Sequence, residues 1–91
     1  MRYSLEKHQT LESLPNIGPR IAGDLRRLGI RTPAQLRGRD PVRLYRALEK
    51  KTGRRQDPCM LDTLMAVTDF MNGAPERPWW AYTAKRKRLM A

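Results

Sequence analysis

Hydrophobic residues recur along this chain at the three- and four-residue spacing of α-helices, and no stretch shows the two-residue alternation of a β-strand. From Pro41 to Thr52 they line one face of the predicted helix. From Pro58 to Asn72 they cover most of the circumference and leave Asp62 and Asp69 outside. A helix that apolar is normally the central one of a bundle, so the pattern predicts an all-α fold.

Capping residues followed by proline mark where these helices begin. The pairs are Thr32-Pro33, Asp40-Pro41 and Asp57-Pro58, with Gly18-Pro19 as a weaker fourth, and Thr32 with Gln35 fits a capping box. Glycines that can close a last helical turn stand at positions 29, 38, 53 and 73. We predict a compact bundle of about five short helices, over Leu5–Leu14, Pro19–Leu28, Pro33–Arg37, Pro41–Thr52 and Pro58–Asn72.

A chain of 91 residues suffices for one domain with a modest core. We place that domain at residues 1–80 and a basic C-terminal tail at residues 81–91, with the run Lys85–Arg88 expected to be disordered in isolation. The single cysteine, Cys59, excludes an internal disulfide and a two-cysteine metal site, and no metal or cofactor is expected. No apolar run reaches the ~18 residues of a membrane span and no secretory signal begins the chain, so we expect a cytoplasmic protein.

Charge narrows the choice of partner. The 19 Lys and Arg residues outnumber the 9 Asp and Glu residues, which gives a formal net charge of +10. Basic residues still outnumber acidic ones when the Lys85–Arg88 run is set aside, so the folded part is itself basic. The mutual repulsion of so many positive charges is tolerated when the partner is a polyanion, and the net charge therefore favours nucleic acid as the partner.

The ten residues Leu14–Gly23 closely resemble the helix-hairpin-helix signature, in which two helices meet through a tight turn with glycines around an isoleucine. Asn16 and Gly18 tolerate a positive φ and can turn the chain sharply, while Ile17 points inward and ties the turn to the core. Amides at the start of the second helix favour a phosphate, and Arg20 adds charge and a forked donor. The family usually has glycine in place of Asn16, whose side chain is large enough to crowd an approaching phosphate.

The resemblance continues beyond this motif. It is carried by Gly29–Thr32, by the helix that Asp40-Pro41 opens, by Thr52–Asp57 before an apolar helix led by Cys59, and by paired tryptophans near the end. Over roughly Thr10–Trp80, the chain is similar to the small stand-alone bacterial proteins of the pathogenicity locus family, some of them known as mitomycin-resistance proteins. The resemblance implies a helix-hairpin-helix fold and a DNA-binding role without defining a mechanism.

The second half of the chain has the same order of elements without the glycine-isoleucine-glycine turn: helix 41–52, a tight link at Gly53–Gln56 and helix 58–72. Two such units about a pseudo-twofold axis form the usual DNA-binding version of this family, a SAM-domain-like or double helix-hairpin-helix arrangement. Four cations cluster around the link: Lys50, Lys51, Arg54 and Arg55. They either contact phosphate or form a solvated helix end, where cations are favourable anyway.

An enzyme is not expected. Some DNA glycosylases carry this hairpin and, farther along the chain, a catalytic aspartate at about the same distance from it as Asp40. Asp40 is already explained as a helix cap, however, and the chain is too short for a base-flipping pocket. No nucleophile with a base and no carboxylate cluster is visible. Cys59 is expected to be a small buried apolar residue, and at least one of Trp79 and Trp80 is expected in the core rather than stacked on a base.

We therefore predict a non-enzymatic module that binds DNA with little sequence preference, duplex more readily than single strands, and takes no small-molecule substrate. The predicted nucleic-acid-binding residues are Asn16, Ile17, Gly18, Arg20, Lys50, Lys51, Arg54 and Arg55. Two alternatives stay open. The bundle with its tryptophan-rich end suits a protein-interaction adaptor, and the hairpin suits the phosphate backbone of structured RNA.

Overall fold

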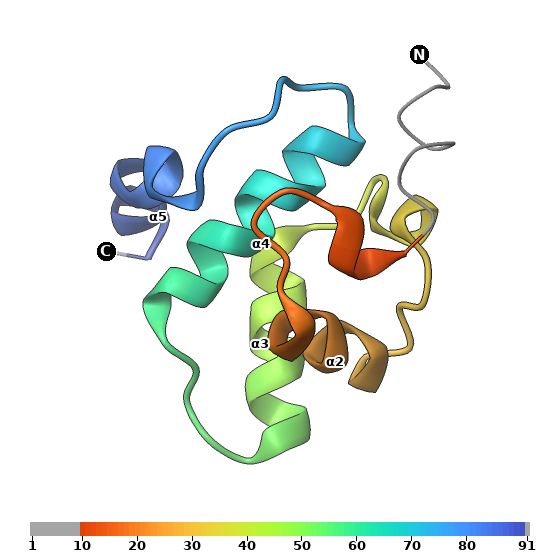
Figure 1. Ribbon diagram of the computed structural model, residues 1–91. Helices are drawn as coiled ribbons and strands as arrows, with labels where there is room; N and C mark the ends of the chain where they lie inside the picture. Colours follow the sequence, from red (N-terminus) through yellow and green to blue (C-terminus); the bar gives the residue numbers. More distant parts are fainter. Residues whose placement is uncertain (1–9, 91) are drawn as a thin grey trace.

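The computed structural model describes residues 10–90, and within that range the chain is helical and contains no strand (Figure 1). Its α-helices are α2 (Pro19–Arg27), α3 (Pro41–Thr52), α4 (Pro58–Met71) and α5 (Thr83–Leu89), and its 3-10 helices are η1 (Leu11–Ser13), η2 (Pro33–Leu36) and η3 (Trp79–Tyr82). The predicted all-α fold is thereby confirmed. Residues 5–9 of the first predicted helix lie outside the described range, and the remaining part of that predicted helix contains the 3-10 helix η1.

Helix α4 is the centre of the molecule, as its apolar pattern predicts. Figure 1 shows α4 passing between α3 and α5, and it contacts both of them as well as η2 and η3. Every residue from Met60 to Thr68 is buried. Leu25 of α2, Leu36 of η2 and Leu48 of α3 are fully buried in the same core, so these three elements each contribute a leucine to it.

The predicted helix boundaries follow from local chemistry. The carboxylates of Asp40 and Asp57 accept hydrogen bonds at 3.0 Å from the backbone N–H groups of Val42 and Cys59, and so cap α3 and α4. Gln35 Oε1 accepts from the backbone N–H of Thr32 at 3.1 Å, as a capping box requires. The four glycines predicted as helix stops all have a positive φ: Gly29, Gly38, Gly53 and Gly73.

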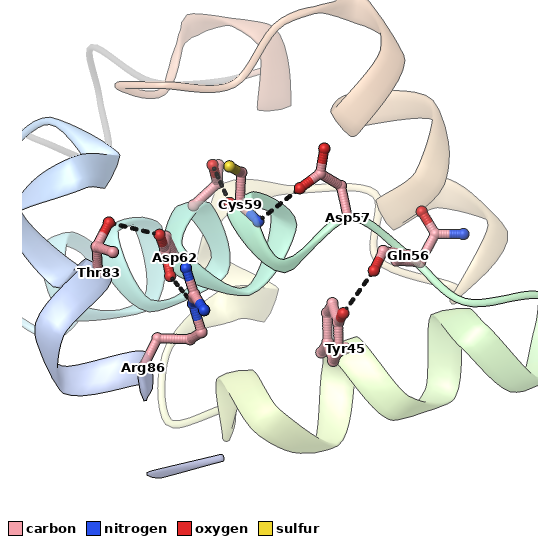
Figure 2. Close-up of polar contacts among 8 residues, drawn as sticks. Tyr45, Gln56, Asp57, Cys59, Asp62, Thr83 and Arg86 are labelled. Carbon is pink, nitrogen blue, oxygen red and sulfur yellow. Dashed lines mark hydrogen bonds and ion pairs between the residues drawn. The ribbon is translucent and has the colours of Figure 1, made fainter. Parts of the chain in front are cut away.

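Asp62 departs from the sequence pattern. We expect it outside α4, and this prediction is wrong, because its side chain is fully buried beneath α5. Thr83 Oγ1 donates to one of its carboxylate oxygens at 2.7 Å and Arg86 Nε donates to the other at 2.8 Å (Figure 2). These two donors from α5 replace the water that the carboxylate gives up on burial.

The expected disorder of the Lys85–Arg88 run is also wrong. The run lies within α5, and the ion pair of Arg86 with Asp62 attaches that helix to α4. Tyr82, just before α5, is buried in the core. The stretch after residue 80 is therefore packed on the bundle, with Lys85, Lys87 and Arg88 exposed on it.

Candidate nucleic-acid interface

The turn before α2 is made by Asn16. Its φ of 68° places it in the left-handed region, as the motif predicts for this position. Ile17 is 5% exposed and its N–H donates to Leu14 O at 3.2 Å, so its side chain lies in the core and its amide is used inside the turn. Gly18 has extended backbone instead of a positive φ, because it is the N-cap of α2, where that conformation is usual.

The side chain of Asn16 is engaged within the protein. Its Nδ2 donates to the backbone carbonyl of Arg77 at 2.8 Å, across 61 positions of sequence. This bond ties the turn to the segment that leads into η3. The amide group that is large enough to crowd a phosphate is therefore held against a carbonyl of the same chain.

The start of α2 differs from the starts of α3 and α4. Its N-cap, Gly18, has no side chain to accept hydrogen bonds from the first-turn amides, whereas the carboxylates of Asp40 and Asp57 accept such bonds in α3 and α4. Pro19 has no N–H, and the amides of Arg20 and Ile21 come before the first residue of α2 that donates within the helix, Ala22. The arrangement suits an anion, because the helix dipole and these amides both favour negative charge there.

A groove runs beside this helix start, between α2 and the link from α3 to α4. It has a volume of about 530 Å³ and brings together four arginines, Arg20 and Arg27 from α2 with Arg54 and Arg55 from the link. We call it the arginine groove. Two carboxylates also line it, Asp24 and Asp57, so the cations are in excess. Arginine presents a planar fork of donors that matches a phosphate group.

The two halves of the sequence prediction meet in this groove. Arg20 comes from the segment predicted as the first hairpin, Arg54 and Arg55 come from the link between α3 and α4, and the fold places all three around the arginine groove. Arg27 joins them although the sequence prediction omits it. The signal was its spacing of seven residues from Arg20, which returns a side chain to the same helix face. Lys50 and Lys51 are exposed on the last turn of α3 and do not line the groove.

The link is fixed from behind at Gln56. The Oη of Tyr45, in α3, donates to the backbone carbonyl oxygen of Gln56 at 2.6 Å (Figure 2), and the backbone N–H of Gln56 donates to Glu49 Oε2 at 3.0 Å. Its side-chain Nε2 donates to Thr52 Oγ1 at 3.2 Å. With these three bonds at Gln56, the neighbouring Arg54 and Arg55 are held at the surface and remain exposed.

Asp57, at the edge of the groove, serves the fold first. Its pKa is lowered, mainly by the hydrogen bond from the backbone N–H of Cys59, with a smaller contribution from the charge of Arg20. Cys59 is half-buried, and burial raises the pKa of its thiol, with Asp57 acting in the same direction. A raised pKa disfavours the thiolate, so Cys59 lacks the environment of a reactive cysteine.

The tryptophan pair lies outside the core. Trp79 is half-buried and Trp80 is 64% exposed, so the expectation that one of them belongs to the core is wrong. The two rings meet edge to face, with centroids 5.6 Å apart. The aromatic residue that this end of the chain contributes to the core is Tyr82.

Metal coordination and membrane insertion have no candidate elements among residues 10–90. That part of the chain holds no group of three or more His, Cys, Asp or Glu side chains able to coordinate a metal ion. It also holds no helix whose length and hydropathy would let it cross a bilayer.

Comparison with known proteins supports the resemblance drawn from the sequence. The family described as "pathogenicity locus" matches residues 4–88. A protein of Streptomyces lavendulae named mitomycin resistance protein McrB is 51% identical over 81 residues, which cover 89% of this chain and 77% of the relative. No solved structure matches the chain.

Proposed function

This chain belongs to the pathogenicity locus family, and from that premise we propose that it is a non-enzymatic module that binds DNA by its phosphate backbone. The observation that carries the proposal is the arginine groove, where Arg20 and Arg27 face Arg54 and Arg55 from a distant segment. A net charge of +10 adds a long-range field that attracts any polyanion. Contacts of this kind fix position on the backbone and carry no sequence information, so sequence preference is low.

In this proposal, the turn at Asn16 and the start of α2 form the first hairpin of a double helix-hairpin-helix arrangement. The left-handed Asn16, the buried Ile17 and the absence of a side-chain cap at Gly18 support this interpretation. The link between α3 and α4 is the second hairpin, in which arginine side chains replace the amides of a glycine turn. A duplex is the preferred ligand, because two hairpins can each hold the backbone of one strand.

The test is fluorescence-anisotropy titration of random duplex DNA at several salt concentrations. The double variant Arg20→Ala/Arg54→Ala removes two groove arginines, and Arg31→Ala/Arg43→Ala removes two exposed arginines that do not line the groove. The slope of log K against log salt is shallower by about 0.9 for every phosphate that a variant no longer neutralises. We expect the groove variant to bind more weakly, with a slope shallower by up to twice that amount, and the control to keep its slope. Equal behaviour of the two variants would contradict the proposal.

A protein-interaction adaptor is the second candidate, and the exposed side chain of Trp80 favours it. Exposed aromatic residues are enriched among those that dominate protein interfaces. This alternative predicts no salt-dependent DNA binding, or binding that disappears with Lys85→Ala/Lys87→Ala/Arg88→Ala and is unaffected by Arg20→Ala. The same titration with structured RNA as competitor decides whether DNA or RNA is the better ligand.

The name of the Streptomyces lavendulae relative suggests a cellular role in mitomycin resistance, which we propose for this chain as well. The role is tested by the survival of mitomycin-treated cells that express the wild-type chain, the groove variant or its control. If the wild type and the control confer resistance and the groove variant does not, the resistance depends on the arginine groove. If the groove variant also confers resistance, the resistance does not depend on DNA binding by the groove.

A further inference from the structure

A second hollow lies on the other side of the link from the arginine groove. It is bounded by α3, the link and α5, and its volume is also about 530 Å³. Arg55 and Gln56 line both spaces, so the two adjoin at the link. Its size falls within the roughly 300–1,000 Å³ of small-molecule sites.

The lining of the second hollow differs from that of the groove. Its surface includes the apolar parts of Tyr45, Pro58, Leu61 and Met90, whereas charged and polar side chains dominate the groove. In Figure 2, Tyr45 and Arg86 both lie below α4, Tyr45 near its start and Arg86 farther along it beneath Asp62. The second hollow therefore offers apolar contact next to a site built for anions.

Three arginines stand around this apolar surface. Arg46 comes from α3, Arg55 from the link and Arg86 from α5. Arg86 is held in place by the bond from its Nε to Asp62. The acidic residue of the lining, Glu49, already accepts the N–H of Gln56. The charge around the second hollow thus complements a nucleotide more than a neutral ligand.

We propose that the second hollow receives an unpaired nucleobase adjoining the stretch of backbone in the arginine groove; this inference rests on the proposed function. A base has apolar faces and a polar rim, and it gains by contact with apolar side chains and guanidinium planes. Inside a duplex those faces are stacked and out of reach. The hollow is open, so it takes a base that is already outside the stack, and its preferred ligand is a duplex with one extrahelical nucleotide.

The test compares three DNA duplexes of the same sequence by anisotropy. One is fully paired, one carries a single bulged nucleotide, and one carries a bulged abasic site, which has the same phosphate charge and lacks the base. The full chain is expected to bind the base-containing bulge about fivefold more tightly than the abasic bulge, which is the low end of the contribution of one base contact. Equal affinity for the two bulges would overturn the inference.

A matched pair of variants locates the effect. Met90→Glu puts a charge into the hollow, and Leu89→Glu puts the same charge on the neighbouring exposed residue, which does not line it. We expect Met90→Glu to abolish the base preference and Leu89→Glu to keep it; the same preference in both would overturn the inference. If Met90→Glu fails to fold by circular dichroism, Arg46→Gln and Arg43→Gln replace the pair with the same expectations. Binding of the fully paired duplex, and its weakening in the groove variant, test the proposed function separately.

Discussion

At the scale of the residue, Asn16 and Gly18 have different roles in the turn before α2. Asn16 supplies the left-handed backbone and uses its side chain to reach Arg77. Gly18 has a conformation open to any residue, so conformational freedom is not what the turn requires of it. What a side chain there would change is the space in front of the α2 amides, because a Cβ at Gly18 meets nothing within 4 Å in the protein.

Gly18→Ala is therefore expected to separate folding from binding. The free energy of unfolding should change by less than about 1 kcal/mol, since alanine is a poorer N-cap than glycine but meets no steric clash. In the proposed function, affinity for duplex DNA should fall several-fold, because the new methyl group would occupy space that the phosphate needs to reach the amides of Arg20 and Ile21. Urea denaturation and anisotropy measure the two effects. Unchanged affinity in the folded variant would place the backbone away from the start of α2.

Glu12 carries a prediction about pH. Its two carboxylate oxygens accept from the two Nη atoms of Arg26 at 2.8 Å each, and these bonds lower its pKa from 4.5 to about 2. A lowered pKa means that the unfolded chain binds protons more readily than the folded one. The stabilisation is therefore complete above pH 4.5 and is lost as the pH falls towards 2.

We expect Glu12→Gln to flatten the dependence of the thermal midpoint on pH over that window, as followed by circular dichroism. Glu76→Gln, at another exposed glutamate, is the control and should keep the dependence of the wild type. The same pH dependence in the wild type and Glu12→Gln would show that the pair with Arg26 contributes nothing to folding in solution.

At the scale of the element, local signals predict more than distant ones do. The caps at Asp40 and Asp57 and the stop at Gly53 were predictable because their partners lie within four residues. Helix α5 was not, because its attachment pairs Arg86 with Asp62, 24 positions away, and both residues look like surface charges in the sequence. The arginine groove was half predictable: Arg20, Arg54 and Arg55 could be singled out in the sequence, but only the fold brings them together.

The attachment of α5 gives the largest expected effect on stability. The side chain of Asp62 is fully buried and that of its partner Arg86 is 17% exposed. Arg86→Ala leaves a buried carboxylate without its cation, which costs about 3–5 kcal/mol. Lys87→Ala, at an exposed neighbour in the same helix, should change the free energy of unfolding by less than about 0.5 kcal/mol.

Urea denaturation of both variants checks this prediction. The double variant Asp62→Leu/Arg86→Leu should recover much of the stability, since replacing both members of a buried ion pair with apolar residues is often neutral. A destabilisation by Arg86→Ala no greater than that by Lys87→Ala would mean that α5 separates from α4 at little cost.

At the scale of the whole molecule, charge and shape play different parts. The radius of gyration of 12.3 Å is the value typical of a folded domain of this length. Its net charge of +10 acts over distance on any approaching polyanion. The arginine groove and the second hollow act only at contact, and they occupy the part of the surface around the link.

This division predicts a kinetic difference between variants of equal charge. Arg20→Ala/Arg54→Ala and Arg37→Ala/Arg39→Ala each remove two cations, and both should slow association with duplex DNA to a similar extent. Only the first pair lines the arginine groove, so only it should speed dissociation, about tenfold or more. Stopped-flow fluorescence at low salt measures both rates. Faster dissociation in both variants alike would make the groove no different from the rest of the surface.

The bond from Asn16 to Arg77 has a consequence for how the protein is made. A nascent chain emerges from its N-terminus, so the turn at Asn16 leaves the ribosome long before the carbonyl that holds it. Arg20 likewise leaves the ribosome before Arg54 and Arg55, so the groove can form only after these two have emerged. In the proposed function, this strongly basic chain therefore gains its phosphate-binding groove only after Arg55 has been synthesised, and its Asn16 turn is held only after Arg77 has followed.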